Sequence, residues 1–173
     1  GGCCGTTPAH IRLFPAIGDG ARPHPPVAPS PSSLRLSGLE ALEICPGSTF
    51  INVGERCNVA GSRRFLRLIK EKNYDEALAI ALRQVRDGAN IIDINMDDPM
   101  LDPPAEMTRF LNLIASEPEI AAVPVMIDSS DWATVRAALE VVQGKSIVNS
   151  ISLKEGEEKF LSKAREIHRY GAA

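Results

Sequence analysis

The chain has 173 residues, of which 44% are hydrophobic and 24% are charged, so it suits one globular domain or parts of two. Its net charge of -3 argues against a nucleic-acid partner, because phosphate-binding surfaces are rich in lysine and arginine. No apolar run reaches the roughly 20 residues of a membrane-spanning helix, so we expect no membrane partner either. The opening Gly-Gly-Cys-Cys shows no signal-peptide pattern and is typical of a part of a longer protein.

Residues 15–31 are distinguished from the rest of the chain by their six prolines. They predict a linker, because a segment rich in proline, glycine and serine holds neither a helix nor a central strand. The prolines concerned are Pro15, Pro23, Pro25, Pro26, Pro29 and Pro31.

Regular patterns begin at about Phe50, where short apolar runs alternate with amphipathic stretches. Gly88 and Gly144 stand where helix C-terminal caps belong. The predicted strands are residues 50–54, 91–95, 123–127 and the segment from Ile147, and the predicted helices are 63–87, 104–115, 132–142 and about 154–170. Residues 171–173 look like the approach to a fifth strand.

Four successive strand–helix units predict parallel strands with helical crossovers, and therefore the α/β class. No Gly-x-Gly-x-x-Gly follows the first strand, so a dinucleotide-binding fold has no direct support. The alternative is a (β/α)8 TIM barrel, which needs about 250 residues. We predict a partial barrel that consists of its first four β/α units, with two open sheet edges.

Polar residues stand at the carboxyl ends of all four predicted strands, where parallel α/β folds bind ligands. Asp128 and Asn149 each follow buried-looking apolar residues at two neighbouring strand ends. A carboxylate beside an amide suits a flat heterocycle that presents donors and acceptors on one edge, so we predict a binding site here. The other polar residues at these ends are Glu55, Arg56, Cys57, Asn58, Asp93, Asn95, Asp97, Asp98, Ser129, Ser130 and Ser150.

Each of these residues also has a structural alternative. Ser129 or Ser130 is suited to cap the following helix, and Asp93 and Asn95 suit structural hydrogen bonds within an apolar run. The pattern favours solvated loop charges for Asp97, Asp98 and Asp102. Oxygen ligands alone would suit Mg²⁺ or Ca²⁺, whereas zinc or iron is disfavoured because the three histidines lie elsewhere: His10, His24 and His168.

Two further patterns concern anions and metals. Gly61-Ser62-Arg63 opens a predicted helix, where backbone amides and an arginine can hold an anionic group; the alternative is a plain loop. Cys3 and Cys4 lie between glycines, and adjacent thiolates in a tight turn can both bind one soft metal ion; the alternative is two free thiols.

The cysteine usage also bears on the compartment. The cysteines do not have the spacing of a secreted disulfide scaffold, and a vicinal pair bridges only with strain. This usage predicts a reducing, cytoplasmic compartment. The four cysteines are Cys3, Cys4, Cys45 and Cys57.

The segment 50–62, FINVGERCNVAGS, resembles the opening of the pterin-binding domain of cobalamin-dependent methionine synthases. The segments 93–97, 126–130 and 147–152 are similar to the next three strands of that domain, in the same order. Residues 1–8, GGCCGTTP, resemble the end of the homocysteine-binding barrel that precedes it. The resemblance is closer than to the related dihydropteroate synthases and corrinoid methyltransferases, in which the Cys-Cys motif is not expected.

The resemblance implies the transfer of a methyl group from 5-methyltetrahydrofolate to cobalamin and then to homocysteine. It implies that methylcobalamin is bound by a cobalamin domain of the full-length enzyme, outside this chain. It also assigns residues by motif: Asp128 and Asn149 to the pterin ring, Gly61, Ser62 and Arg63 to the folate near the mouth, Glu55 and Asn58 to the lining of the site, and Cys3 and Cys4 to two of three zinc ligands.

The resemblance divides the chain into a stub of the homocysteine-binding barrel over 1–14, a proline-rich linker over 15–47 and the first half of the pterin-binding domain over 48–173. Proline interrupts the helix expected after the Cys-Cys motif, and the third zinc ligand is expected upstream. With half of the folate barrel we expect weak folate binding and no catalysis by this chain alone. The remaining hypotheses are a non-catalytic folate-binding module, a dihydropteroate synthase-like enzyme or corrinoid methyltransferase, and a gene fragment without a role.

Overall fold

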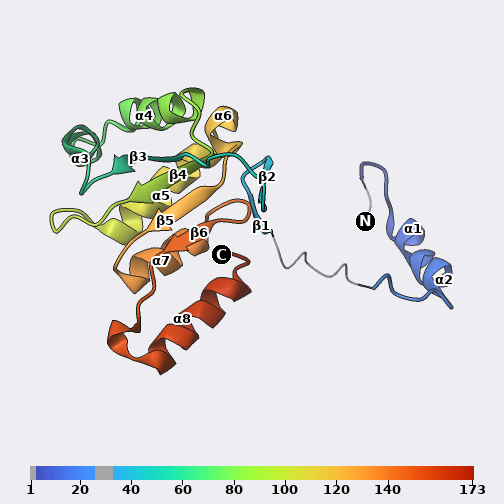
Figure 1. Ribbon diagram of the computed structural model, residues 1–173. Helices are drawn as coiled ribbons and strands as arrows, with labels where there is room; N and C mark the ends of the chain where they lie inside the picture. The colour runs from blue at the N-terminus through green and yellow to red at the C-terminus, as the bar shows by residue number, and fades with distance from the viewer. Residues whose placement is uncertain (1–2, 26–32) are drawn as a thin grey trace. The chain divides into compact units, whose positions relative to one another are not determined.

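The computed structural model describes residues 3–25 and 33–173, and the chain forms two compact units, residues 1–31 and 32–173 (Figure 1). Residues 26–32 of the predicted linker and the first two glycines lie outside the described residues. In the described part of the chain, no helix combines the length and the apolar character needed to cross a membrane.

The first unit contains two short helices, α1 (Pro8–Arg12) and α2 (Phe14–Gly18). The prediction that residues 15–31 hold no helix is wrong for residues 15–18. Pro15 lies in the first turn of α2, where a backbone N–H has no helical partner to lose and the fixed φ of proline favours the helix.

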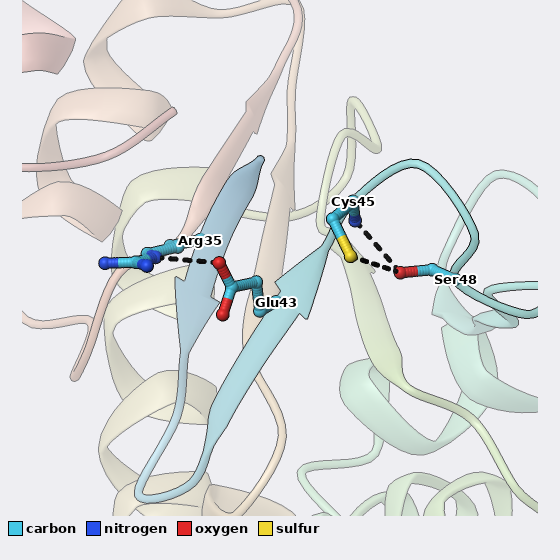
Figure 2. A network of polar contacts seen from close by, with 4 residues as sticks. All are labelled: Arg35, Glu43, Cys45 and Ser48. Atoms are coloured by element: carbon cyan, nitrogen blue, oxygen red, sulfur yellow. Dashed lines mark hydrogen bonds and ion pairs between the residues drawn. The ribbon is translucent and has the colours of Figure 1, made fainter. Parts of the chain in front are cut away.

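The second unit opens with an antiparallel hairpin, β1 (Leu34–Ser37) and β2 (Ala41–Ile44). The predicted linker over 15–47 is therefore wrong for residues 34–44. Arg35 and Glu43 oppose each other in the hairpin, and Arg35 Nε donates to Glu43 Oε1 at 3.0 Å (Figure 2). After β2, the Cys45 backbone N–H donates to Ser48 Oγ at 2.9 Å and closes a turn (Figure 2).

Backbone hydrogen bonds attach this hairpin to the main sheet. Ser37 and Lys145 exchange N–H···O bonds of 3.1 and 2.9 Å, and the Leu39 N–H donates to the Ala121 carbonyl at 2.8 Å. Lys145 and Ala121 precede the strands β6 (Ile147–Asn149) and β5 (Val125–Asp128). The hairpin therefore covers the amino-terminal end of the sheet and leaves the carboxyl ends of the strands accessible.

Gly38 makes this attachment possible. A Cβ at this position would lie 2.3 Å from the Ala121 carbonyl oxygen and 2.5 Å from that of Val123, closer than any real contact. We expect Gly38→Ala to lower the free energy of unfolding by about 1–2 kcal/mol, since overpacking against backbone is costly but the hairpin can detach. Urea unfolding measures the change. Gly61→Ala is the control, because Gly61 does not have a left-handed φ and its added Cβ would lie at ordinary contact distance, 3.7 Å from the nearest atoms of Asn58; an equal loss in that variant would contradict the steric explanation.

The main sheet has four parallel strands in the order β3-β4-β5-β6, which adds β3 (Val53–Asn58) and β4 (Ile91–Asn95) to the two strands above (Figure 1). This confirms the predicted α/β class and is consistent with the first four units of a (β/α)8 barrel. Ala173 lies beside β6, where its N–H donates to the Ser146 carbonyl and its carbonyl accepts from the Val148 N–H, both at 2.9 Å. This is the pairing that the predicted approach to a fifth strand requires.

Helices alternate with the strands, and α5 and α7 lie behind the sheet (Figure 1). The predicted helix over 63–87 is divided, because Lys72 has a left-handed backbone with φ of 58° and the Asn73 side chain caps the second part. Phe65 and Phe110 pack edge to face at 5.3 Å in the core between the sheet and the helices. The helices are α3 (Arg63–Lys70), α4 (Tyr74–Arg86), α5 (Pro103–Ala115), α6 (Pro118–Ala121), α7 (Trp132–Leu139) and α8 (Glu157–Arg169), with a 3₁₀ turn over Leu153–Glu155.

Candidate functional site

The last residues of the four parallel strands lie opposite one another. Asn58 pairs in register with Asn95, Asn95 with Asp128, and Asp128 with Asn149. Residues in register on neighbouring strands share a face of the sheet, so these four form one line across its carboxyl end, which we call the polar row. The polar row offers one carboxylate among three amides.

Hydrogen bonds hold the first three members of the polar row together. Asp128 Oδ2 accepts from Asn58 Nδ2 at 3.3 Å and from Asn95 Nδ2 at 3.1 Å. The oxygens of the two amides are held by the following loops: Asn58 Oδ1 accepts from the Gly61 N–H, and Asn95 Oδ1 from the Asp97 N–H, both at 2.9 Å. The orientation of the Asp128 carboxylate is therefore determined by groups on β3 and β4.

Asp97 is not the solvated loop charge that the sequence predicted. It accepts hydrogen bonds from Ser129 Oγ at 2.6 Å, from Ser130 N at 2.8 Å and from Ser130 Oγ at 3.0 Å. These contacts join the loop after β4 to the loop after β5, directly beyond the polar row. The cap of α7 is Asp131, whose carboxylate accepts from the Thr134 N–H at 2.9 Å, so the interpretation of Ser129 or Ser130 as that cap is wrong.

The other two aspartates of this group behave as local structural charges. Asp98 forms an ion pair of 3.2 Å with Lys70, whose side chain is about one-third exposed. Asp102 caps α5 by accepting from the Ala105 N–H at 3.2 Å. Neither of these partners, Lys70 or Ala105, belongs to the polar row.

Asp93 is a buried carboxyl on the same strand face as Asn95, two residues earlier in β4. Only 4% of the residue is exposed, and burial, with the nearby charge of Asp128, raises its pKa to about 6. Burial also raises the pKa of Asp128. Burial therefore disfavours the ionised form of both carboxyls, a pattern that concentrates at functional sites.

The end of β3 forms one wall of the site. A surface pocket there is lined by Val53, Glu55, Arg56, Asn58 and Gly61, which brings together three of the residues predicted to bind folate. The neighbouring helix α3 begins at the exposed Arg63. Ser62 caps that helix, because its hydroxyl accepts from the Phe65 N–H at 3.2 Å, and Asn149 lies exposed at the opposite end of the polar row.

Cys57, which precedes Asn58 at the end of β3, is not part of the site, because its side chain lies in the core. The residue has no exposed surface, and burial raises the pKa of its thiol to about 12. A neutral, enclosed thiol is a poor nucleophile. Its role is packing between β3 and the helices.

Cys3 and Cys4 belong to the first unit and are both exposed. They lie on a tight turn in which the Cys3 N–H donates to Thr6 Oγ1 at 3.0 Å and Gly5 has φ of 89°. Two thiols supply half of a zinc coordination sphere. Within residues 3–25 and 33–173, however, no three potential metal ligands gather, so the residues present do not complete a zinc site.

Asn95 is the member of the polar row that the sequence reasoning left outside the predicted ligand set. The signal was available, because Asn95 lies two residues after Asp93 on one strand, so both side chains face the same way.

Residues 54–173 match the family described as "Pterin binding enzyme". The chain belongs to this family. The match begins within β3 and includes the whole polar row, whereas the first unit and the hairpin precede it. The family therefore supports the sequence prediction of a pterin-binding or folate-binding module, and its barrel fold agrees with the parallel sheet described above.

Proposed function

We propose that the polar row binds the pterin ring of a reduced folate. The observation that carries this proposal is the in-register placement of one oriented carboxylate among three amides at the carboxyl end of a parallel sheet. A pterin presents an amino group and a ring N–H side by side, together with acceptor atoms on the same flat ring. Asp128 suits the two donors as an acceptor, and the Asn149 amide suits the acceptors as a donor.

Around the ring we assign the residues that line the same mouth. Glu55 and Asn58 lie on the pocket wall at the end of β3. Gly61, Ser62 and Arg63 stand at the start of α3, where they would contact the part of the folate that extends from the ring.

At a finer level, we propose that the chain is the folate-binding part of a cobalamin-dependent methionine synthase. The support is the sequence resemblance of residues 50–62 and the Cys3-Cys4 motif, in the order expected for that enzyme. In this reaction the C–N5 bond of 5-methyltetrahydrofolate breaks, the methyl group leaves as a cation equivalent, and N5 retains the electron pair. N5 must be protonated in order to leave, because it would otherwise depart as a strongly basic anion, and a polar pocket around the ring can support that proton.

The other cofactors of this proposal lie outside the polar row. Cobalamin would be carried by a cobalamin domain of the full-length enzyme; as cob(I)alamin it would take up the methyl group, and the resulting methylcobalamin would pass that group to homocysteine. Cys3 and Cys4 would hold zinc with a ligand from beyond the described residues, and zinc supplies a thiolate form of homocysteine at neutral pH. Because the described residues do not complete the zinc site, we derive no step through it.

Trp132, the single tryptophan, begins α7 four residues after Asp128, and we expect its fluorescence to respond to a ligand bound at the polar row. We expect 5-methyltetrahydrofolate to quench its fluorescence in a weak but saturable titration of the 173-residue chain. The p-aminobenzoylglutamate half of folate lacks the pterin ring, and we expect it to give no saturable change at the same concentrations. Saturable quenching by this half alone would contradict recognition through the ring, and no quenching by either would reject the proposed site.

A further inference from the structure

The strand β3 contains an extra residue next to the site. Gly54 pairs with Ile92 and Cys57 pairs with Ile94. Two residues of β3, Glu55 and Arg56, therefore oppose one residue of β4, Asp93. This two-against-one arrangement is a β-bulge, a feature that re-aims side chains beside active sites.

The bulge decides which side chains of β3 face the ligand. Side chains alternate along a strand, so in a regular strand Gly54 and Cys57, three residues apart, would face opposite sides. With the bulge both face the helices, as the core residues Ile92 and Ile94 do. The next residue, Asn58, consequently faces the polar row; without the bulge it would point into the core.

The side chain of Gln84, from α4, satisfies the backbone that the bulge displaces. Gln84 Oε1 accepts from the Arg56 N–H at 2.6 Å, and Gln84 Nε2 donates to Cys57 Sγ at 3.3 Å. Gly54 gives this side chain its space, since a Cβ on Gly54 would lie 2.9 Å from Gln84 Oε1. The extra residue and the residue after it are thus both held by one amide from the helix layer.

We propose that Gln84 is a positioning residue of the pterin site: it holds the β3 bulge and thereby keeps Asn58 in the polar row. The inference deepens the proposed function and rests on it for its consequence in ligand binding. Gln84 itself contacts no ligand, because it lies on the helix side of the sheet. Its effect passes through Asn58 Nδ2 to the Asp128 carboxylate, which that amide orients.

The state of the bulge is measured without any ligand, by amide hydrogen exchange in the full chain. Gln84→Met keeps the length of the side chain and removes the hydrogen bonds of its amide to Arg56, Cys57 and Ile80, so the Arg56 amide should exchange at least about tenfold faster. Gln143→Met makes the same chemical change at the other glutamine, which is far from Arg56 in the sequence and whose Nε2 donates to the Val141 carbonyl. Gln143→Met should leave Arg56 unchanged. If Gln84→Met does not fold, Gln84→Asn, one methylene too short to reach, replaces it in the same measurement.

Measurements of ligand affinity distinguish a positioning role of Gln84 from a general loss of stability. We expect Gln84→Met to raise the Kd for 5-methyltetrahydrofolate roughly tenfold, and to have no further effect in an Asn58→Ala background, because both changes act through one side chain. Gln84→Glu retains an acceptor for the Arg56 N–H and should restore most of the affinity.

Either of two results would overturn the inference: unchanged exchange at Arg56 in Gln84→Met, or losses in affinity that add fully to those of Asn58→Ala. If the unsubstituted chain binds no pterin, the proposed function fails by itself. The exchange of the Arg56 amide still decides whether Gln84 holds the bulge in that case.

Discussion

Replacing Asp93 by asparagine is expected to raise the free energy of unfolding at about pH 7 by roughly 3 kcal/mol. The buried carboxyl has a pKa of about 6 in the folded chain, against an ordinary value of 3.8, because burial and the charge of Asp128 disfavour its ionised form. A difference of about two pH units corresponds to this energy. The asparagine side chain keeps the shape and the hydrogen-bonding capacity of the protonated acid, and it removes the charge that is costly to bury.

The pH dependence of this gain follows from proton linkage. Because the pKa is higher in the folded state, the folded chain retains a proton between about pH 4 and pH 6 that the unfolded chain has already lost. The contribution of Asp93 to stability is therefore fully present below about pH 4 and is lost as the pH rises through 6. We expect Asp93→Asn to match the unsubstituted chain at about pH 4 and to exceed it increasingly up to pH 7.

Urea unfolding at these two pH values measures the gain, and Asp131→Asn is the matched control. Hydrogen bonds from Thr134 lower the pKa of Asp131, so its charged form stabilises the fold and its replacement should bring no gain at pH 7. A gain in Asp93→Asn that is equal at both pH values would show that packing, and not charge burial, is responsible. A carboxylate kept at such a cost in stability supports a role for Asp93 beside the ligand.

The sheet was largely predictable from the sequence because its strands are short runs of isoleucine and valine. The boundaries of β4, residues 91–95, agree with the prediction, whereas β3 starts at Val53 and extends through polar residues to Asn58. Hydrophobic pattern does not reveal such an extension, because Glu55 and Arg56 are exposed at the mouth. The hairpin over 34–44 was missed for a similar reason: backbone contacts with residues more than eighty positions away stabilise it.

The site was predictable where the signal was local to a strand end. Asp128 and Asn149 were expected on neighbouring strands, and they pair in register. The position of Asp97 was predicted wrongly, because its partners Ser129 and Ser130 become neighbours only when β4 and β5 pair. Gln84 gave no signal of its own, since a polar residue on an amphipathic helix is normally solvated and a bulge leaves no mark in hydrophobic spacing.

Replacing Asp128 by alanine is the change expected to affect ligand binding most. The carboxylate is the single negative group of the polar row, and two amides hold it toward the position proposed for the pterin donors. Loss of hydrogen bonds to a charged group should weaken the binding of 5-methyltetrahydrofolate by about 1.5–3 kcal/mol, or roughly 10- to 150-fold in Kd. Asp128→Asn retains an acceptor without the charge and should fall between alanine and the unsubstituted chain.

The charge of Asp128 also predicts how binding depends on pH. Burial raises its pKa, and only the ionised form accepts from both pterin donors, so affinity should fall as the pH is lowered through that raised pKa. In Asp128→Ala this part of the pH dependence should disappear. The Trp132 titration measures both effects, with Asp87→Ala as a control that removes an exposed carboxylate paired with Arg83. Equal affinities for Asp128→Ala and Asp87→Ala would remove Asp128 from the site, and the polar row would then lose the observation on which the proposed function depends.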